Sequence, residues 1–228
     1  MLHSQPRAAM AVAMFLAAGA AAQPASAAIR VLDFSGAICE TPSKACSNGA
    51  AISASYGDAE GVDVSYRAAD PVSGATDPLL RWWGPGFGDV EGVVWGGNSS
   101  TFSEITLKAA PGYEIALISF DFATYLGRFA SSPVSIASLD GTDILSGPLS
   151  TNPGAHNHVE VASAFFEDGI RLRWGPNGYD VGMDNITFEV RALPNAPVPE
   201  PTTWAMLIAG FGGIGTMMRR RRGALAAA

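Results

Sequence analysis

Aromatic side chains are the residues of this sequence best suited to contact a sugar. Trp82 and Trp83 stand side by side in residues 70–88, where proline and glycine are dense and we expect a loop. Indole rings offer flat apolar surfaces that stack on sugar rings, although tryptophan also fills hydrophobic cores. In a loop at least one ring of the pair should be exposed, so both residues are candidates for binding glycan. Trp95 and Trp174 end alternating segments and are expected in the core.

Histidines and carboxylates supply two further candidate sites. His156 and His158 form H-x-H, which on a strand would place both rings on one face, where zinc could use them. No third ligand is indicated nearby, so a solvated loop is the stronger interpretation. Asp121 with Glu160 or Asp180 could act as the acid and base of a glycosidase. Sequence spacing does not show that these carboxylates converge.

Catalytic signatures are missing from the sequence. Neither G-x-S-x-G nor H-E-x-x-H occurs in the chain. We therefore expect no enzymatic activity, and an enzyme that acts on polysaccharide is the alternative.

The charge distribution excludes one class of partner. The whole chain carries a net charge of −7, but all 21 acidic residues and only nine basic ones lie between residues 28 and 200, where the net charge is −12. Such a segment repels phosphate backbones, so we expect no nucleic acid as a partner. Cations and neutral polysaccharides suit it better.

Short alternating segments separated by Gly, Pro, Asn and Asp predict an all-β domain over residues 28–192. About ten strands in this length favour an antiparallel two-sheet sandwich that resembles a jelly roll. The expected strands cover residues 29–35, 50–56, 61–67, 90–96, 101–109, 112–125, 133–141, 158–166, 169–175 and 181–192. Residues 146–157 are polar and rich in turn formers, and we expect a loop there.

Strict alternation predicts which side chains of two long strands face the core. In residues 114–122 it places Phe120 and Phe122 on the more apolar face and Asp121 on the other. In residues 181–190 it places Asp184 on the core-facing side, at the rim of the strand.

The N-terminus has the pattern of a secretory signal peptide. Arg7 precedes an apolar run from residue 8 to 22, and Ala25 and Ala27 form an A-x-A exit. We expect cleavage after Ala27, which makes residues 1–27 the signal peptide and implies the Sec machinery and signal peptidase as partners. The run is shorter than the roughly 20 residues that a spanning helix needs.

The only two cysteines, Cys39 and Cys46, bracket a Thr-Pro-Ser turn. In an oxidising compartment such a pair predicts one disulfide bond. A metal site would need further thiol or imidazole groups nearby, which the sequence does not supply.

The C-terminus combines three features in order. Residues 193–201 form a proline-rich linker that ends in Pro199, Glu200 and Pro201. Residues 202–222 contain Trp204, an apolar stretch and the basic cluster Arg219, Arg220, Arg221 and Arg222, and residues 223–228 form a tail. The apolar stretch predicts one short transmembrane helix, and the arginines place its end in the cytoplasm.

These residues resemble the PEP-CTERM sorting signal in its PEP-x-x-W-A variant. The resemblance implies a Gram-negative bacterium that makes exopolysaccharide. It also implies a transient anchor in the inner membrane and an exosortase, a membrane cysteine protease, that processes the protein near the PEP motif.

The exported domain is also similar to those of many PEP-CTERM proteins. Residues 110–113 (APGY), 117–122 and 184–188 (DNITF) carry this second resemblance, which implies a jelly-roll sandwich. In jelly-roll modules a calcium ion commonly joins the first and last strands. The resemblance thus makes Asp33 and Asp184 candidate ligands of a structural calcium ion, which prefers hard oxygen donors. A capping or backbone-pairing role for Asp184 is the alternative.

Together these features predict an exported, exosortase-processed protein of the cell surface or exopolysaccharide matrix. We expect a structural or adhesive role with glycan as a ligand and exopolysaccharide as a partner. A purely structural matrix protein without a ligand is the second alternative.

Overall fold

The computed structural model describes residues 27–39, 45–77, 79–97, 101–128, 131–152, 154–177, 180–193, 206 and 208–211. Contacts divide the chain into two compact units, one of them Ala25–Ala196 and the other Met1–Pro24 together with Pro197–Ala228. The expected signal peptide before Ala27, the linker after Leu193 and most of the expected membrane helix, with the arginine cluster and the tail, lie outside the described residues. Of the second unit, Met206 and residues 208–211 are helical. No helix in the described part of the chain is long and apolar enough to span a membrane.

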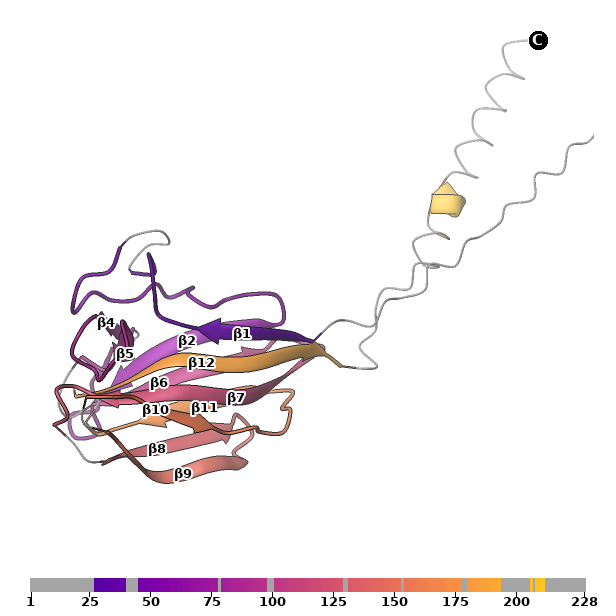
Figure 1. Cartoon of the computed structure of the whole chain (residues 1–228). Coiled ribbons are helices and arrows are strands. Elements are labelled where there is room, and N and C mark those ends of the chain that lie inside the picture. Colours follow the sequence, from indigo (N-terminus) through magenta and orange to yellow (C-terminus); the bar gives the residue numbers. More distant parts are fainter. Residues whose placement is uncertain are drawn as a thin grey trace, which may run out of the picture. The chain divides into compact units, whose positions relative to one another are not determined.

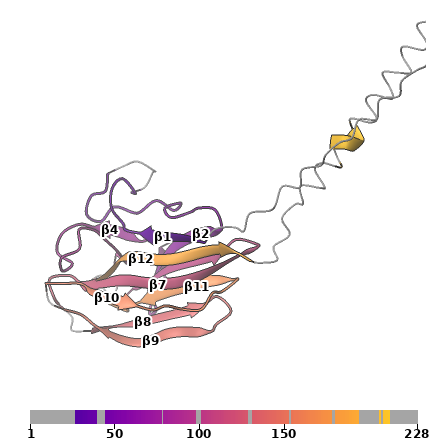
Figure 2. The ribbon, with the colours of Figure 1, turned by 45° about the vertical axis from the view of Figure 1, so that its right-hand side comes forward.

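The unit Ala25–Ala196 consists of strands in two sheets (Figures 1 and 2). The first sheet contains β1 (Ala28–Leu32), β4 (Arg81–Trp83), β5 (Val93–Trp95), β7 (Tyr113–Thr124), β10 (Asn157–Glu160) and β12 (Val181–Ala192). The second sheet contains β2 (Val62–Ala69), β3 (Thr76–Asp77), β6 (Phe102–Ala109), β8 (Ser131–Ser138), β9 (Asp143–Ser150) and β11 (Gly169–Trp174).

All strand pairs described in both sheets are antiparallel. The first sheet has the order β10-β7-β12-β5-β4, and β1 pairs with β12 beside β5; the second has the order β3-β2-β6-β11-β8-β9. The predicted all-β antiparallel sandwich is thus confirmed, and the layout is consistent with the expected jelly-roll-like domain.

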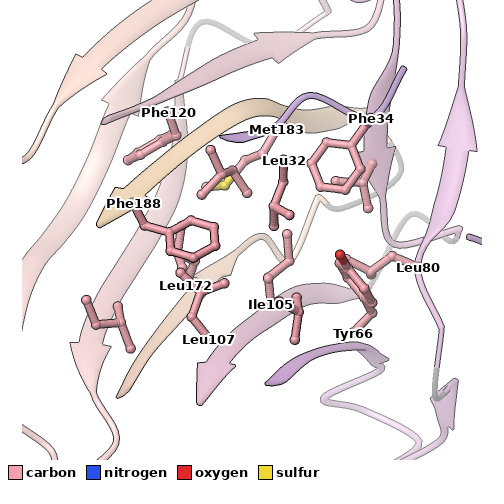
Figure 3. Packing of buried hydrophobic residues seen from close by; sticks show 14 of the residues in the cluster. Leu32, Phe34, Tyr66, Leu80, Ile105, Leu107, Phe120, Leu172, Met183 and Phe188 are labelled. Atoms are coloured by element: carbon pink, nitrogen blue, oxygen red, sulfur yellow. The ribbon is translucent and has the colours of Figure 1, made fainter. Parts of the chain in front are cut away.

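The core lies between the two sheets, as the alternating sequence requires. In β2 the valines, Tyr66 and Ala68 are buried while Asp63, Ser65 and Arg67 are exposed. Side chains of both sheets meet in one cluster, which Figure 3 shows with Leu32, Met183 and Phe188 from the first sheet and Ile105, Leu107 and Leu172 from the second. Burial of this apolar surface is the main stabilising contribution to the fold. Trp95 and Trp174 are both buried, as predicted.

Strict alternation fails in the two longest strands. Register shifts interrupt the β7–β12 pairing after Asp184, and Asn185 has a φ of 48°. An extra residue of this kind exchanges the faces of a strand. Met183 and Ile186, three residues apart, therefore both enter the core. The prediction that Asp184 faces the core is wrong, because Asp184 lies on the opposite side of the sheet from its neighbour Met183.

Several predicted boundaries are also wrong. Residues 50–56 form only isolated bridges at Ala51 and Ile52, and the strand expected over 158–166 is the short β10. Conversely, β4 lies within the loop expected at 70–88, and β9 runs into the loop expected at 146–157. Pro148 in β9 weakens the sequence pattern that would predict a strand there. In the structure Pro148 stands opposite Pro133 on an edge strand, where proline is tolerated.

The predicted disulfide bond between Cys39 and Cys46 is confirmed, with an S–S distance of 2.08 Å. Cys39 is buried against the core and forms a bridge with Ile52. The bond thus fixes the segment that follows β1 to the body of the sandwich.

Candidate functional site

The two candidate tryptophans lie on β4 and project to opposite sides, as consecutive residues of a strand must. Trp83 packs edge-to-face against Trp95 and Tyr125 at centroid distances of 5.8 and 5.7 Å. Together with these two rings and Phe87, Trp83 encloses only about 10 Å³. Trp83 therefore belongs to a small second core rather than to a ligand site.

Trp82 instead lines a roomy pocket of about 480 Å³ at one end of the sandwich. We call it the acidic pocket, because its lining includes Asp33, Asp89, Glu91 and Asp184 together with Trp82 and Asn185. The prediction that one of the two rings is exposed is wrong: both tryptophans are half-buried.

Four segments build the pocket around the indole of Trp82, and one of them contributes only His156. Its Nε1 donates a hydrogen bond to the carbonyl oxygen of Phe34 at 2.8 Å, which holds the segment after β1 against β4. A Cβ on Gly92 would lie 2.8 Å from the same Nε1, so glycine is needed for this close approach. The third segment is β12, which supplies Asp184 and Asn185.

The acidic pocket lies at the end of the sandwich opposite the point where the chain leaves it. β1 and β12 run antiparallel, with Ala28 opposite Val190 and Leu32 opposite Ile186 (Figure 1). Asp33 follows β1 directly, and Asp184 lies eight residues before the end of β12 at Ala192. At roughly 3.3 Å per strand residue, the pocket is about 25 Å from that exit.

Asp184 is the most buried carboxylate of the pocket, with 5% of its surface exposed. Burial, together with the negative charges of Asp121 and Asp33, raises its pKa to about 7, although the Asn185 backbone N–H and His156 act in the opposite direction. That N–H donates to Oδ1 of Asp184 at 2.8 Å. Within the described residues Oδ2 receives no hydrogen bond.

A row of polar side chains continues from Asp184 across the first sheet. Asp184 stands opposite Asp121 on β7, and Asp121 stands opposite His158 on β10. Asp121 accepts hydrogen bonds from Asn185 Nδ2 at 2.7 Å and contacts Nδ1 of His158 at 2.7 Å. The hydrogen bond to Asp121 raises the pKa of His158 above its ordinary value.

Asp33 and Asp89 are ionised at neutral pH. Burial raises the pKa of Asp33, but hydrogen bonds from Ser35 and Tyr56 outweigh it and lower the pKa below its ordinary value. The hydrogen bonds from the side chain and the backbone of His156 lower the pKa of Asp89. Both of these His156 groups lie 2.8 Å from Asp89 Oδ1.

The structure brings the two expected calcium ligands, Asp33 and Asp184, to the same pocket. However, the described residues contain no group of three or more His, Cys, Asp and Glu side chains arranged to hold a metal ion. The Asp33 oxygens already accept three hydrogen bonds, from Ser35 N–H, Ser35 O–H and Tyr56 O–H. This donor set fits calcium poorly, and calcium binding stays a prediction.

His156 and His158 lie on one side of the sheet, since both approach Asp121, His156 Nε2 at 3.8 Å and His158 Nδ1 at 2.7 Å. His158 lies in the strand β10 and not in the expected solvated loop, although the side chain of His158 is 50% exposed. Zinc binding has no third ligand in the described part of the chain.

The carboxylate pairs considered for a glycosidase are engaged with other side chains. His158 lies between Asp121 and Glu160, with its Nε2 3.2 Å from Glu160 Oε1. Asp180 forms an ion pair with Arg128 at 3.1 Å. The absence of enzymatic activity stays a prediction.

Sequence reasoning missed Asp89, Glu91 and Asn185 as lining residues. Asp89 and Glu91 stand in a glycine-rich stretch without a ligand-binding pattern, so no sequence signal marks them. Asn185 belongs to the DNITF segment, and asparagine's tolerance of positive φ is the signal that could have identified it.

Comparison with solved structures finds a similarity to the crystal structure of the Podospora anserina GH26-CBM35 β-(1,4)-mannanase. The sequence identity is 10%, the TM-score is 0.31, and the match covers 61% of this chain and 29% of that one. The chain thus spans less than a third of that protein, and a likeness at this level supports no functional argument. A search of curated proteins finds no match.

The C-terminal residues match a family model described as the PEP-CTERM protein-sorting motif, over residues 197–222. The match includes Pro199, Glu200, Pro201, Trp204 and the four arginines 219–222, which carry the resemblance in the sequence. The match confirms the interpretation of this segment: the chain carries a PEP-CTERM sorting motif, the signal of a protein exported for processing by an exosortase.

Proposed function

We propose that this protein is an exported component of the cell surface or exopolysaccharide matrix, and that its sandwich binds glycan in the acidic pocket. The role is structural or adhesive rather than enzymatic. The sorting motif at residues 197–222 supports export and processing by an exosortase.

The observation that carries glycan binding is the composition of the pocket. The half-buried ring of Trp82 provides an apolar wall, and carboxylates and an amide surround it. Sugar sites combine such a stacking surface with a few fixed polar groups. The volume of about 480 Å³ lies within the range of small-ligand sites.

The place of the pocket supports the same role. It lies about 25 Å from the end of β12, where the chain continues toward the sorting motif. The residues that line the pocket therefore belong to a different stretch of the chain from the motif that the exosortase recognises.

A glycan array probed with the full chain in mild detergent tests this proposal. Trp82→Ala is expected to abolish binding, and Trp82→Phe to weaken it several-fold because the smaller ring loses stacking area. Trp83→Phe is the matched control, since Trp83 packs away from the pocket on the same strand. Circular dichroism verifies that each variant is folded.

Binding that survives Trp82→Ala would move the glycan site elsewhere. No binding to any glycan would leave a purely structural matrix protein, and hydrolysis of polysaccharide by the purified chain would establish the enzymatic alternative.

A further inference from the structure

We propose that the acidic pocket binds a cationic sugar, an amino sugar whose protonated primary amine contacts the pocket carboxylates. This inference rests on the proposed glycan binding at the same pocket and defines its ligand class.

The charge of the lining is the first reason. Four carboxylates, those of Asp33, Asp89, Glu91 and Asp184, line the pocket. Its described lining residues include no lysine or arginine, and the one basic side chain among them, His156, is bound to Asp89. The potential inside such a concave, acidic surface favours a positively charged group.

The hydrogen-bonding capacity of the lining is the second reason, because several of its side-chain donors are engaged within the protein. Trp82 Nε1 donates to the Phe34 carbonyl, the Asn185 amide donates to Asp121, and the hydroxyl of Ser35 donates to Asp33. The pocket is left rich in acceptors. A sugar hydroxyl needs both donors and acceptors, whereas an ammonium group carries three donors and no acceptor.

Asp184 is the third reason. It is 95% buried and lines the pocket, yet its Oδ2 receives no hydrogen bond within the described residues. Oδ2 does not belong to the fully buried side-chain atoms that lack a partner, so it is open to the pocket, where the donors of an ammonium group can reach it. Asp121 stands opposite it on β7 and increases the local negative charge.

The layout favours an ammonium group on a sugar over a bare metal ion. Among the described residues, no three His, Cys, Asp or Glu side chains are arranged to coordinate one metal ion. A pocket of about 480 Å³ is also far larger than an ion requires. Trp82 adds a ring face that can stack on a pyranose and attract a cation at the same time.

Isothermal titration of the full chain in mild detergent tests the inference. The probes are a tetramer of β-1,4-linked glucosamine and its fully N-acetylated counterpart, which has the same skeleton without the charge. We expect the glucosamine tetramer to bind at least about tenfold more tightly, the factor that corresponds to one charge-assisted hydrogen bond. Added salt should reduce this preference.

Asp184→Asn removes the central carboxylate, which a bound ammonium group would keep ionised, and preserves the shape of the side chain. It is expected to weaken binding of the glucosamine tetramer roughly tenfold and to change binding of the acetylated tetramer little. Glu167→Gln is the matched control, because Glu167 is an exposed acid outside the pocket lining and its loss changes the net charge equally. It should bind like the unaltered chain.

The remaining outcomes separate the inference from the proposed function. Equal affinity for the two tetramers, unaffected by Asp184→Asn, would overturn the cationic ligand and leave glycan binding intact. Binding of neither tetramer, with calcium chloride alone giving a binding isotherm, would overturn the inference in favour of a metal site. Binding of neither tetramer nor any array glycan would overturn both proposals.

Discussion

At the scale of single residues, Asp184 lines the pocket, and its ionisation lowers the stability of the folded protein. Its pKa of about 7 in the folded protein lies well above that of an unfolded aspartate. The folded state therefore holds the proton more tightly than the unfolded state, and stability falls as the pH rises between about 4 and 7. Residues that cost stability while lining a pocket are typical of binding sites.

Asp184→Asn is expected to stabilise the protein near neutral and basic pH. The amide keeps the acceptor for the Asn185 N–H but carries no charge to desolvate, so the gain reaches up to about 4 kcal/mol above pH 7 and vanishes below about pH 4. Urea unfolding of both proteins at about pH 5 and about pH 8 measures this difference. A variant that is less stable at about pH 8, or whose advantage is the same at both pH values, would contradict the assignment of the raised pKa.

At the scale of elements, the bulge in β12 determines which of its side chains faces the pocket. Asn185, at a φ of 48°, allows Met183 and Ile186 to share the core while Asp184 faces the pocket. A residue in this left-handed region favours glycine over alanine, the reverse of the preference inside an ordinary strand.

Asn185→Gly is therefore expected to be more stable than Asn185→Ala by about 1 kcal/mol. Both variants lose the hydrogen bond to Asp121, so that loss cancels in the comparison. Ser135 on the exposed side of β8 is the control, and there Ser135→Gly should be less stable than Ser135→Ala. Thermal unfolding of the four variants shows whether glycine or alanine is the more stable residue at each position. Alanine being more stable than glycine at both positions would show that the bulge does not form.

The disulfide bond connects the segment that follows Asp33 in the sequence to the sandwich. Replacing Cys39 and Cys46 by serine should lower the free energy of unfolding by roughly 2–3 kcal/mol, the chain-entropy value for so short a loop. Denaturation with and without reductant measures the loss, and the double variant should not respond to reductant. An unchanged midpoint after complete reduction would mean that the bond does not stabilise the domain.

The fold class could be predicted from the sequence, and the pocket only in part. Alternation locates β2, β6 and β11 well, since nothing interrupts their period of two. It fails at the β12 bulge, because the extra residue is fixed by pairing with β7. The opposite orientations of Trp82 and Trp83 depend on β4, a three-residue strand that forms through its pairing with β5 and with the segment around Ala51. Long-range pairing of this kind leaves no local signal.

At the scale of the whole molecule, the sorting motif and the proposed glycan site lie in different parts of the chain. The sorting motif covers residues 197–222, and the compact unit with the acidic pocket ends at Ala196. The two roles therefore occupy separate stretches of the chain, and changes in one should leave the other intact.

Glu200→Gln, or replacement of the four arginines 219–222 by serine, is expected to leave the protein unprocessed or mislocalised in a bacterium that has an exosortase. The mass of the protein in the envelope and extracellular fractions measures processing. Glu167→Gln, which lies outside the motif, should mature normally. Unchanged maturation of the motif variants would rule out the assigned role of residues 197–222.

Hydrogen exchange of the full chain shows whether the acidic pocket binds glycan, as proposed above. Exchange is measured by mass spectrometry with and without the glucosamine tetramer and its acetylated counterpart. We predict protection at residues 33–36 and 89–92, the two segments that enclose Trp82, with at least one of the tetramers. Protection confined to the exposed side of β2, β6 and β11, or no protection with either tetramer, would contradict the claim.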